Sequence, residues 1–167
     1  MKWRKYDPRI DTEIDSWGDP TYSQHASYMN RIKRHNEHMQ FQSDWYQRHP
    51  EEISLMGNFA VVACVGQRTT AIMVLDYFKD KEGRFLCGIN PFIVDPKQSH
   101  QGYGTMILHD FLIHAESIIG LKIDAFYAGI DQSNKISIKL FEKFGFVKIG
   151  ENQTHQFSYF ERKNQHR

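Results

Sequence analysis

The clearest hydrophobic pattern in this chain is a repeat of apolar residues every three or four positions in two segments. In residues 102–119 this spacing is that of one face of an α-helix. Residues 133–144 place Ile136, Leu140 and Phe144 on one face, and Gly145 follows as a typical helix end. We therefore predict two amphipathic helices. The apolar positions of the first are Ile107, Leu108, Phe111, Leu112, Ala115 and Ile119.

Longer apolar runs rich in β-branched and aromatic residues predict strands. Residues 58–66 and 71–78 are separated by the polar segment QRTT, which indicates an antiparallel hairpin. A third run, residues 84–95, contains Pro91, whose missing N–H breaks a ladder hydrogen bond and predicts a bulge or splayed strand. Further strands are predicted at residues 121–129, 146–149 and 155–161.

The first third of the chain is polar, rich in aromatic residues and irregular in pattern. A helix is predicted from Tyr22 to Met39, because Pro20 suits a helix entrance, and a shorter one at residues 42–47. The element order predicts an α/β fold, with helices on the faces of a mixed sheet. We expect one domain over residues 1–167, with a helical acceptor-binding region at 1–57 and a sheet-bearing core at 58–167.

Composition and charge narrow the functional classes. The 167 residues are 40% hydrophobic and 14% aromatic, which is typical of a folded globular chain. Lys and Arg number 21 against 20 for Asp and Glu, so no net field favours nucleic acid or an anionic membrane. The apolar runs are far shorter than the ~20 residues of a membrane helix, and the first residues lack the apolar core of a signal peptide. A cytoplasmic location is expected.

Cysteine and histidine usage gives no sign of a disulfide framework or a metal site. Cys64 and Cys87 both lie inside apolar strand runs, which indicates small buried residues. His35 and His38 share a predicted helix face, but no nearby spacing supplies the further ligands that zinc needs. We expect no metal.

The most informative segment is PFIVDPKQSHQGYGTMIL, residues 91–108, in which a strand leads through a glycine-containing loop into the first amphipathic helix. Free N–H groups at a helix start bind anions, and Gly102 and Gly104 let a phosphate approach the backbone. Thr105 adds a hydroxyl donor. No Gly-Lys-Ser/Thr follows, and the preceding strands form hairpins, so neither a nucleotide P-loop nor a dinucleotide fold is indicated. A flexible turn without a ligand is the alternative.

IVDPKQSHQGYGTMIL resembles motif A of the GNAT superfamily of N-acetyltransferases, and DQSNKISIKLFEKFGF resembles its motif B. The resemblance extends from the third strand to Ile149. It implies a GNAT-like fold with mostly antiparallel N-terminal strands, a bulged fourth strand and a central helix on a pyrophosphate loop. It also implies acetyl-CoA as co-substrate.

The same resemblance implies which residues bind acetyl-CoA. Backbone groups near Ile93 and Val94 would pair with the pantetheine arm. Asn134, at the start of the motif B helix, would bond the cofactor, with a purely local hydrogen bond as the alternative. The amides that would hold the pyrophosphate belong to Gln101, Gly102, Tyr103, Gly104 and Thr105.

Two positions depart from the family pattern. Ser99 stands where motif A has Arg or Gln, so that contact is lost or moves to Gln98 or Gln101. Phe141 stands where many relatives carry a tyrosine that protonates the leaving thiolate. Coenzyme A thiolate can leave without a dedicated acid, so catalysis by proximity and an oxyanion donor from the bulged strand stays open.

The acceptor side carries fewer signals, and no catalytic base is identified. GIN, residues 88–90, resembles the Gly-Ile-Asp of some aminoglycoside 6'-N-acetyltransferases, but Asn90 has no basic group near neutral pH. Asn90 either orients an amine or water or is structural. Tyr28 and the pair Trp45 and Tyr46 are expected to shape a substrate pocket, with core packing as the alternative.

Together these features predict an acetyl-CoA-dependent N-acetyltransferase (an acyltransferase) acting on a primary amine by direct attack on the thioester, with a small-molecule acceptor favoured. The alternatives are a non-catalytic CoA-binding module and a protein N-terminal or lysine acetyltransferase. A nucleic-acid-binding module using Arg31, Lys33 and Arg34 has little support at a net charge of +1. The segment QFSYF near the C-terminus fits either a homodimer interface or a core strand.

Overall fold

The structure is a computed structural model that describes residues 1–18 and 53–165. The helices predicted at residues 22–39 and 42–47 lie outside the described residues, as do Tyr28, Trp45 and Tyr46.

A seven-stranded sheet in the order β1-β2-β3-β4-β5-β7-β6 forms the centre of the described part. The pairing of β4 with β5 is parallel, and the other neighbouring pairs are antiparallel. The mixed sheet predicted from the element order is confirmed. The strands are β1 (Lys2–Lys5), β2 (Ile53–Val65), β3 (Arg68–Asp80), β4 (Phe85–Val94), β5 (Ala125–Asp131), β6 (Val147–Glu151) and β7 (Phe157–Lys163).

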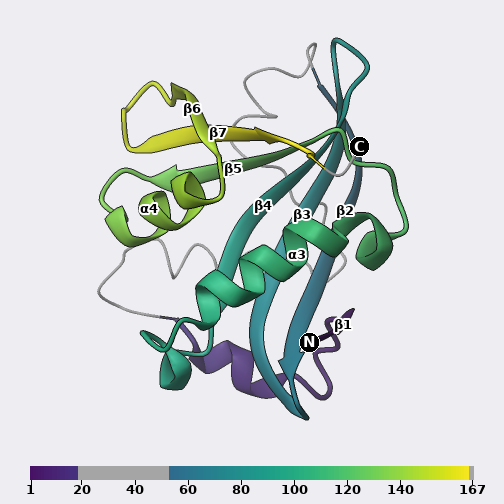
Figure 1. Cartoon of the computed structure of the whole chain (residues 1–167), viewed down its shortest axis with the longest axis vertical. Coiled ribbons are helices and arrows are strands. Elements are labelled where there is room, and N and C mark those ends of the chain that lie inside the picture. The colour runs from purple at the N-terminus through teal and green to yellow at the C-terminus, as the bar shows by residue number, and fades with distance from the viewer. Residues whose placement is uncertain (19–52, 166–167) are drawn as a thin grey trace.

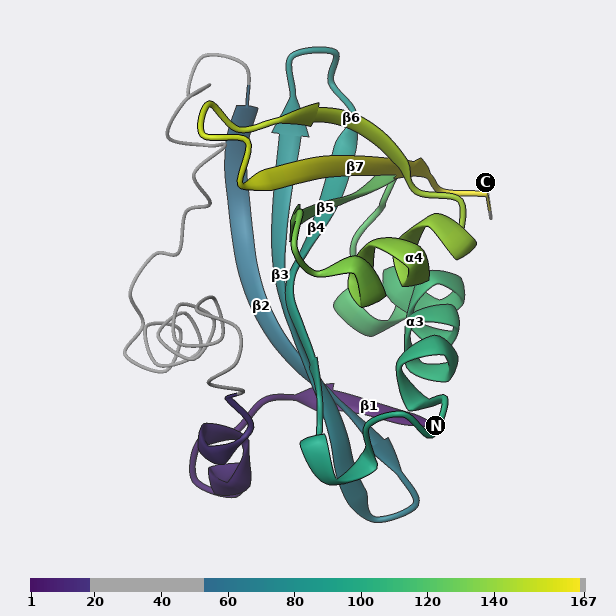
Figure 2. The same cartoon turned by 90° about the vertical axis from the view of Figure 1, so that its left-hand side faces the viewer.

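Two helices cover one face of this sheet. α3 (Tyr103–Ile119) and α4 (Lys135–Lys143) lie on the same side, and the short 3-10 helix η1 (Thr12–Ser16) lies on the other side (Figure 2). A second 3-10 helix, η2 (Pro96–Gln98), connects β4 to the loop before α3. Both amphipathic helices are confirmed to within two residues at each end.

The buried stripe of α4 differs from the predicted one. Ile136 is exposed, whereas Phe141 is buried and Leu140 and Phe144 are half-buried. The helix thus meets the core with the side that carries Phe141. A spacing of four residues alone does not distinguish these neighbouring stripes, because they lie close together around the helix.

The N-terminal boundary of the core also needs correction. The predicted helical region at residues 1–57 contributes β1 to the sheet, and β2 begins at Ile53, earlier than the predicted residue 58. β1 pairs with β2, and Trp3 donates a hydrogen bond from Nε1 to Asp110 Oδ2 on α3 at 2.6 Å. The turn after β2 is shorter than QRTT, since β3 already starts at Arg68.

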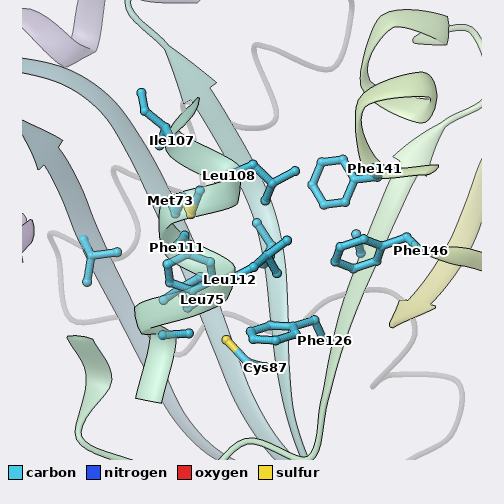
Figure 3. Packing of buried hydrophobic residues seen from close by; sticks show 14 of the residues in the cluster. Met73, Leu75, Cys87, Ile107, Leu108, Phe111, Leu112, Phe126, Phe141 and Phe146 are labelled. Atoms are coloured by element: carbon cyan, nitrogen blue, oxygen red, sulfur yellow. The ribbon is translucent and has the colours of Figure 1, made fainter. Parts of the chain in front are cut away.

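The main hydrophobic core lies between the sheet and the two helices. Leu108 and Phe111 of α3, Phe126 of β5 and Phe141 of α4 all enter it (Figure 3). Fully burying one such side chain contributes roughly 1.5–3 kcal/mol. Cys87 lies in this core, Cys64 is buried on the opposite face, and both are free thiols, as predicted.

Candidate functional site

The bulge predicted at Pro91 is present in β4. Met73 of β3 pairs with Phe92 and Leu75 pairs with Ile89, so β4 contains one residue more than β3 between these pairs. An extra residue changes which side chains face each side of a sheet. Ile89 packs in the α3-side core before the bulge, whereas Phe92 packs against that core after it.

Beyond Gly88, β4 loses its neighbour. The parallel pairing of β4 with β5 ends at the pair Gly88 and Tyr127, and the two strands diverge from there (Figure 1). Within the part of the chain that the structure describes, no strand pairs with this edge of residues 89–94. An open strand edge of this kind can pair with the backbone-like amides of an extended ligand.

The register of β4 against β3 determines which residues present polar groups at the open edge. The Asp95 N–H bonds to the Thr70 carbonyl at 2.8 Å, and hydrogen-bonded residues alternate along an antiparallel pair. Ile93 therefore directs its N–H and C=O to β3. Val94 and Phe92 direct theirs to the open edge. Of the two predicted pantetheine contacts, Val94 has the suitable backbone orientation and Ile93 does not.

The loop that follows ends in a helix start with unused N–H groups. Gly102 is the N-cap of α3 with φ 82°, and no side chain caps it. The Met106 N–H bonds to the Gly102 carbonyl at 3.1 Å, so the N–H groups of Tyr103, Gly104 and Thr105 precede the first intrahelical bond. These N–H groups and the helix dipole make the start of α3 suitable for an anion.

The two glycines of the loop have different roles. Gly102 adopts a left-handed backbone that other residues rarely adopt, and a Cβ there would have nothing within 4 Å. A Cβ at Gly104 would lie 3.7 Å from Leu140 Cδ2 of α4 and 3.8 Å from Val94 Cγ2. Gly104 therefore borders the narrow space between α3, α4 and the open edge of β4.

Asp95, a residue the sequence analysis did not single out, organises the approach to the loop. Its buried carboxylate accepts hydrogen bonds from the Lys97 N–H (2.9 Å), Gln98 Nε2 (3.0 Å) and Arg68 Nη2 (2.9 Å). Burial opposes ionisation, but the Gln98, Lys97 and Arg68 contacts together lower the pKa of Asp95. Gln98 is therefore turned into the protein, and of the two substitutes for the motif A contact only Gln101 is exposed.

Asn134 makes the local hydrogen bond that the sequence analysis gave as the alternative. It is the N-cap of α4, and its Oδ1 accepts from the Ser137 N–H at 3.1 Å. Its Nδ2 group takes no part in this bond, so the cap leaves an amide donor at the helix start. The neighbouring Asp131 Oδ1 accepts from the N–H and hydroxyl of Ser133, each at 2.6 Å.

Phe141 occupies the core and supplies no proton. It is 4% exposed, and its ring meets Phe146 edge-on with centroids 4.9 Å apart (Figure 3). Asn90 lies in β4 at the bulge, but its side chain is outside the description. Among the described residues, no cluster of three metal-ligating side chains and no helix long and apolar enough to cross a membrane is found.

Comparisons with known proteins agree with this arrangement. A sequence model of the acetyltransferase (GNAT) family matches residues 14–146. No curated protein sequence matches the chain.

Solved structures similar to this fold are acetyltransferases with low sequence identity. An aminoglycoside N(6')acetyltransferase from Legionella pneumophila has a TM-score of 0.70 at 13% identity, covering 99% of this chain and 92% of that one. A chimeric spermidine N-acetyltransferase SpeG from Vibrio cholerae and hSSAT has a TM-score of 0.64 at 13% identity, covering 99% and 96%. The ribosomal-protein-S18-alanine N-acetyltransferase from Escherichia coli has a TM-score of 0.56 at 10% identity, covering 96% and 90%.

The family match covers most of the chain, and the diverging strands and uncapped helix start lie where motif A predicted them. The chain therefore belongs to the GNAT family of acetyltransferases.

Proposed function

We propose that this protein is an N-acetyltransferase that transfers the acetyl group of acetyl-CoA to the primary amine of a small molecule. The observation that carries the proposal is the continuity between the open edge of β4 and the uncapped start of α3. An extended arm with an anionic group at one end fits these two features together. Acetyl-CoA has that form, because its pantetheine arm is joined to a pyrophosphate.

In this proposal the N–H groups of the loop from Gln101 to Thr105 hold the pyrophosphate. The backbone of Val94, together with that of Phe92, pairs with the amides of the arm. Asn134 adds its Nδ2 group from the start of α4. The thioester then lies toward the point where β4 and β5 separate, near Gly88 and Tyr127.

The acceptor has one open direction of approach. The side of the sheet that faces α3 and α4 is filled by the main core, including Leu108, Phe111 and Phe126 (Figure 3). An amine must therefore reach the thioester from the opposite side. The predicted acceptor residues Tyr28 and Asn90 are proposed to belong to that side.

The proposed reaction is direct attack of a neutral amine on the thioester carbon. The C–N bond forms, the C–S bond breaks, and the sulfur leaves with its electron pair. Positioning the two reactants supplies much of the acceleration in such a step. Phe141 has no proton to give, so the thiolate leaves without help from that position.

A small-molecule acceptor is favoured by the names of two similar structures, which act on spermidine and aminoglycosides. The third similar structure, named for a ribosomal protein, favours a protein acetyltransferase as the second candidate. A non-catalytic CoA-binding module is the remaining alternative, favoured by Phe141 and Ser99. A single domain, a cytoplasmic location and a homodimer remain part of the proposal.

The test is acetyl-CoA turnover measured by thiol release with spermidine, kanamycin, free amino acids and short peptides. Binding of CoA is measured in parallel by calorimetry. Release with spermidine or kanamycin would support the small-molecule reading, whereas release with peptides alone would favour the second candidate. Binding without release on any amine would contradict catalysis.

A further inference from the structure

We propose that Asp76 and Tyr127, on either side of Gly88, bind the ammonium group of the acceptor, and that Asp76 takes its proton before attack. This inference rests on the proposed function and deepens it, because it names a cationic amine as the substrate and a residue as the proton acceptor.

The three residues form one row across three strands. Asp76 of β3 pairs with Gly88 of β4, and Gly88 pairs with Tyr127 of β5. Strands lie about 4.8 Å apart, so the backbones of Asp76 and Tyr127 are about 10 Å apart with a residue lacking a side chain between them. A Cβ at Gly88 would lie 3.5 Å from Asp76 Cβ. The glycine thus leaves room for a small group between the carboxylate and the phenol.

This row lies at the closed end of the opening between β4 and β5. Gly88 and Tyr127 are the last pair before the strands diverge. The edge that follows is the one assigned to the pantetheine arm, so the far end of the arm points to this row. An amine held here would lie next to the reacting thioester.

The row also lies on the side from which an acceptor can approach. Tyr127 packs with Phe78 and Tyr159 in a cluster separate from the main core. Asp76 shares this side of β3 with Phe78, because side chains alternate along a strand and Tyr77 between them enters the main core. The carboxylate therefore faces away from α3 and α4.

The surroundings of Asp76 suit a cation. The rings of Tyr127 and Tyr159 stack with centroids 5.7 Å apart, and Phe78 meets Tyr127 edge-on at 6.1 Å. Aromatic faces and a carboxylate are the groups that recognise an ammonium ion. Burial, and then the negative charges of Tyr159 and Asp76, raise the pKa of Tyr127, so its hydroxyl stays protonated.

The proton balance of the step is complete. The ammonium gives one proton to the Asp76 carboxylate, and the freed lone pair forms the C–N bond to the acetyl carbon. The C–S bond breaks, and the second proton of the amine goes to the departing thiolate. The products are the acetamide, CoA thiol and protonated Asp76, which returns its proton to water.

The experiment compares Asp76→Asn with the wild type on the amine of the spermidine, kanamycin and lysine panel that the wild type acetylates fastest. A missing general base costs about 10²–10⁴-fold in rate, so kcat/KM for the amine should fall at least about 100-fold. The Kd for acetyl-CoA should stay within about twofold of the wild-type value, because Asp76 does not touch the arm. Asp76→Glu, which keeps the carboxylate, should recover part of the activity.

Asp11→Asn is the matched control, because Asp11 is an equally buried carboxylate that pairs with Arg4 near η1. It should keep the wild-type kcat/KM. Tyr127→Phe is the second variant should Asp76→Asn fail to fold, and it should raise KM for the amine without changing the Kd for acetyl-CoA.

Wild-type kinetics in Asp76→Asn, or an unchanged KM in Tyr127→Phe, would overturn the inference and leave the proposed function intact. A wild type that binds acetyl-CoA but releases no thiol with any amine would overturn the proposed function and the inference together.

Discussion

The Nε2 group of Gln98 donates a hydrogen bond to Oδ2 of Asp95 at 3.0 Å, and both side chains are buried where β4 passes into the loop before α3. Arg68 Nη2 bonds to the same oxygen from β3. The loop is thus fixed to the sheet at its first residues. This explains how a chain with Ser99 in place of the usual motif A residue can still keep the α3 start in position.

Replacing Asp95 with asparagine should weaken both the fold and the cofactor site. An amide keeps one acceptor oxygen, so at least one of the three donors loses its partner, at a cost of about 1–3 kcal/mol. We expect a lower free energy of unfolding in guanidinium and a several-fold higher Kd for CoA by calorimetry. A destabilised variant with wild-type CoA affinity would show that Asp95 supports the fold alone.

The acid dependence of stability should carry the signature of the same carboxylate. The pKa of Asp95 is lower in the folded protein than its usual value of about 3.9. Ionised Asp95 therefore contributes stability that is present above about pH 4 and is lost as the pH falls through its lowered pKa. Unfolding free energies measured from pH 6 to pH 2 should fall less steeply in Asp95→Asn. Parallel curves for the two proteins would contradict this assignment.

A methyl group at Gly104 should separate cofactor binding from stability. The added Cβ would make ordinary van der Waals contacts with Leu140 and Val94, and alanine favours a helix by up to about 1 kcal/mol over glycine. Gly104→Ala should therefore fold at least as stably as the wild type. Because the methyl enters the space assigned to acetyl-CoA, the Kd for CoA should rise about tenfold, a loss of about 1.4 kcal/mol.

Gly150→Ala is the matched control for this substitution, since a Cβ there has nothing within 4 Å and lies on β6. It should leave the Kd for CoA unchanged. Equal Kd values for Gly104→Ala and the wild type would place the arm elsewhere.

Two substitutions at Asn134 should distinguish capping from cofactor binding. Serine caps a helix about as well as asparagine but has no amide donor, so Asn134→Ser should keep its stability and bind CoA several-fold more weakly. Asn134→Ala should also lose about 1 kcal/mol of stability. Thermal unfolding and calorimetry check both values. Unchanged CoA affinity in Asn134→Ser would assign the residue to capping alone.

The thiols of the folded protein should be unreactive. Burial, and then the charge of Asp76, raise the pKa of Cys87, so its thiol stays neutral at assay pH, and Cys64 is also buried. We expect no labelling of Cys87 by iodoacetamide at pH 8 in the native state. Unfolding in guanidinium should make both cysteines reactive. Rapid native labelling of Cys87 would contradict its placement in the core.

The parts of the site that depend on local sequence could be predicted. Gly102 and the helix after it follow from residues close together in the chain, as does the bulge at Pro91. The short strand β1 could not, because four residues give too little pattern and the strand forms only by pairing with β2. The role of Asp95 was missed because an Asp-Pro pair in sequence indicates only a turn.

The row of Asp76, Gly88 and Tyr127 could not be predicted for a different reason. It depends on the register of β3 against β4 and on the parallel pairing of β4 with β5. That parallel pairing spans a helix crossover, and each register step would change the facing side chains. Only the assembled sheet brings a carboxylate and a phenol to either side of one glycine.

The most direct test of the central claim is the rate of thiol release from acetyl-CoA by the wild-type protein with spermidine and with kanamycin, alongside calorimetric binding of CoA. The account predicts CoA binding together with release well above the rate without amine for at least one of the two. Absence of CoA binding would contradict the assignment of the β4 edge and the α3 start, and binding without release on any amine would contradict catalysis.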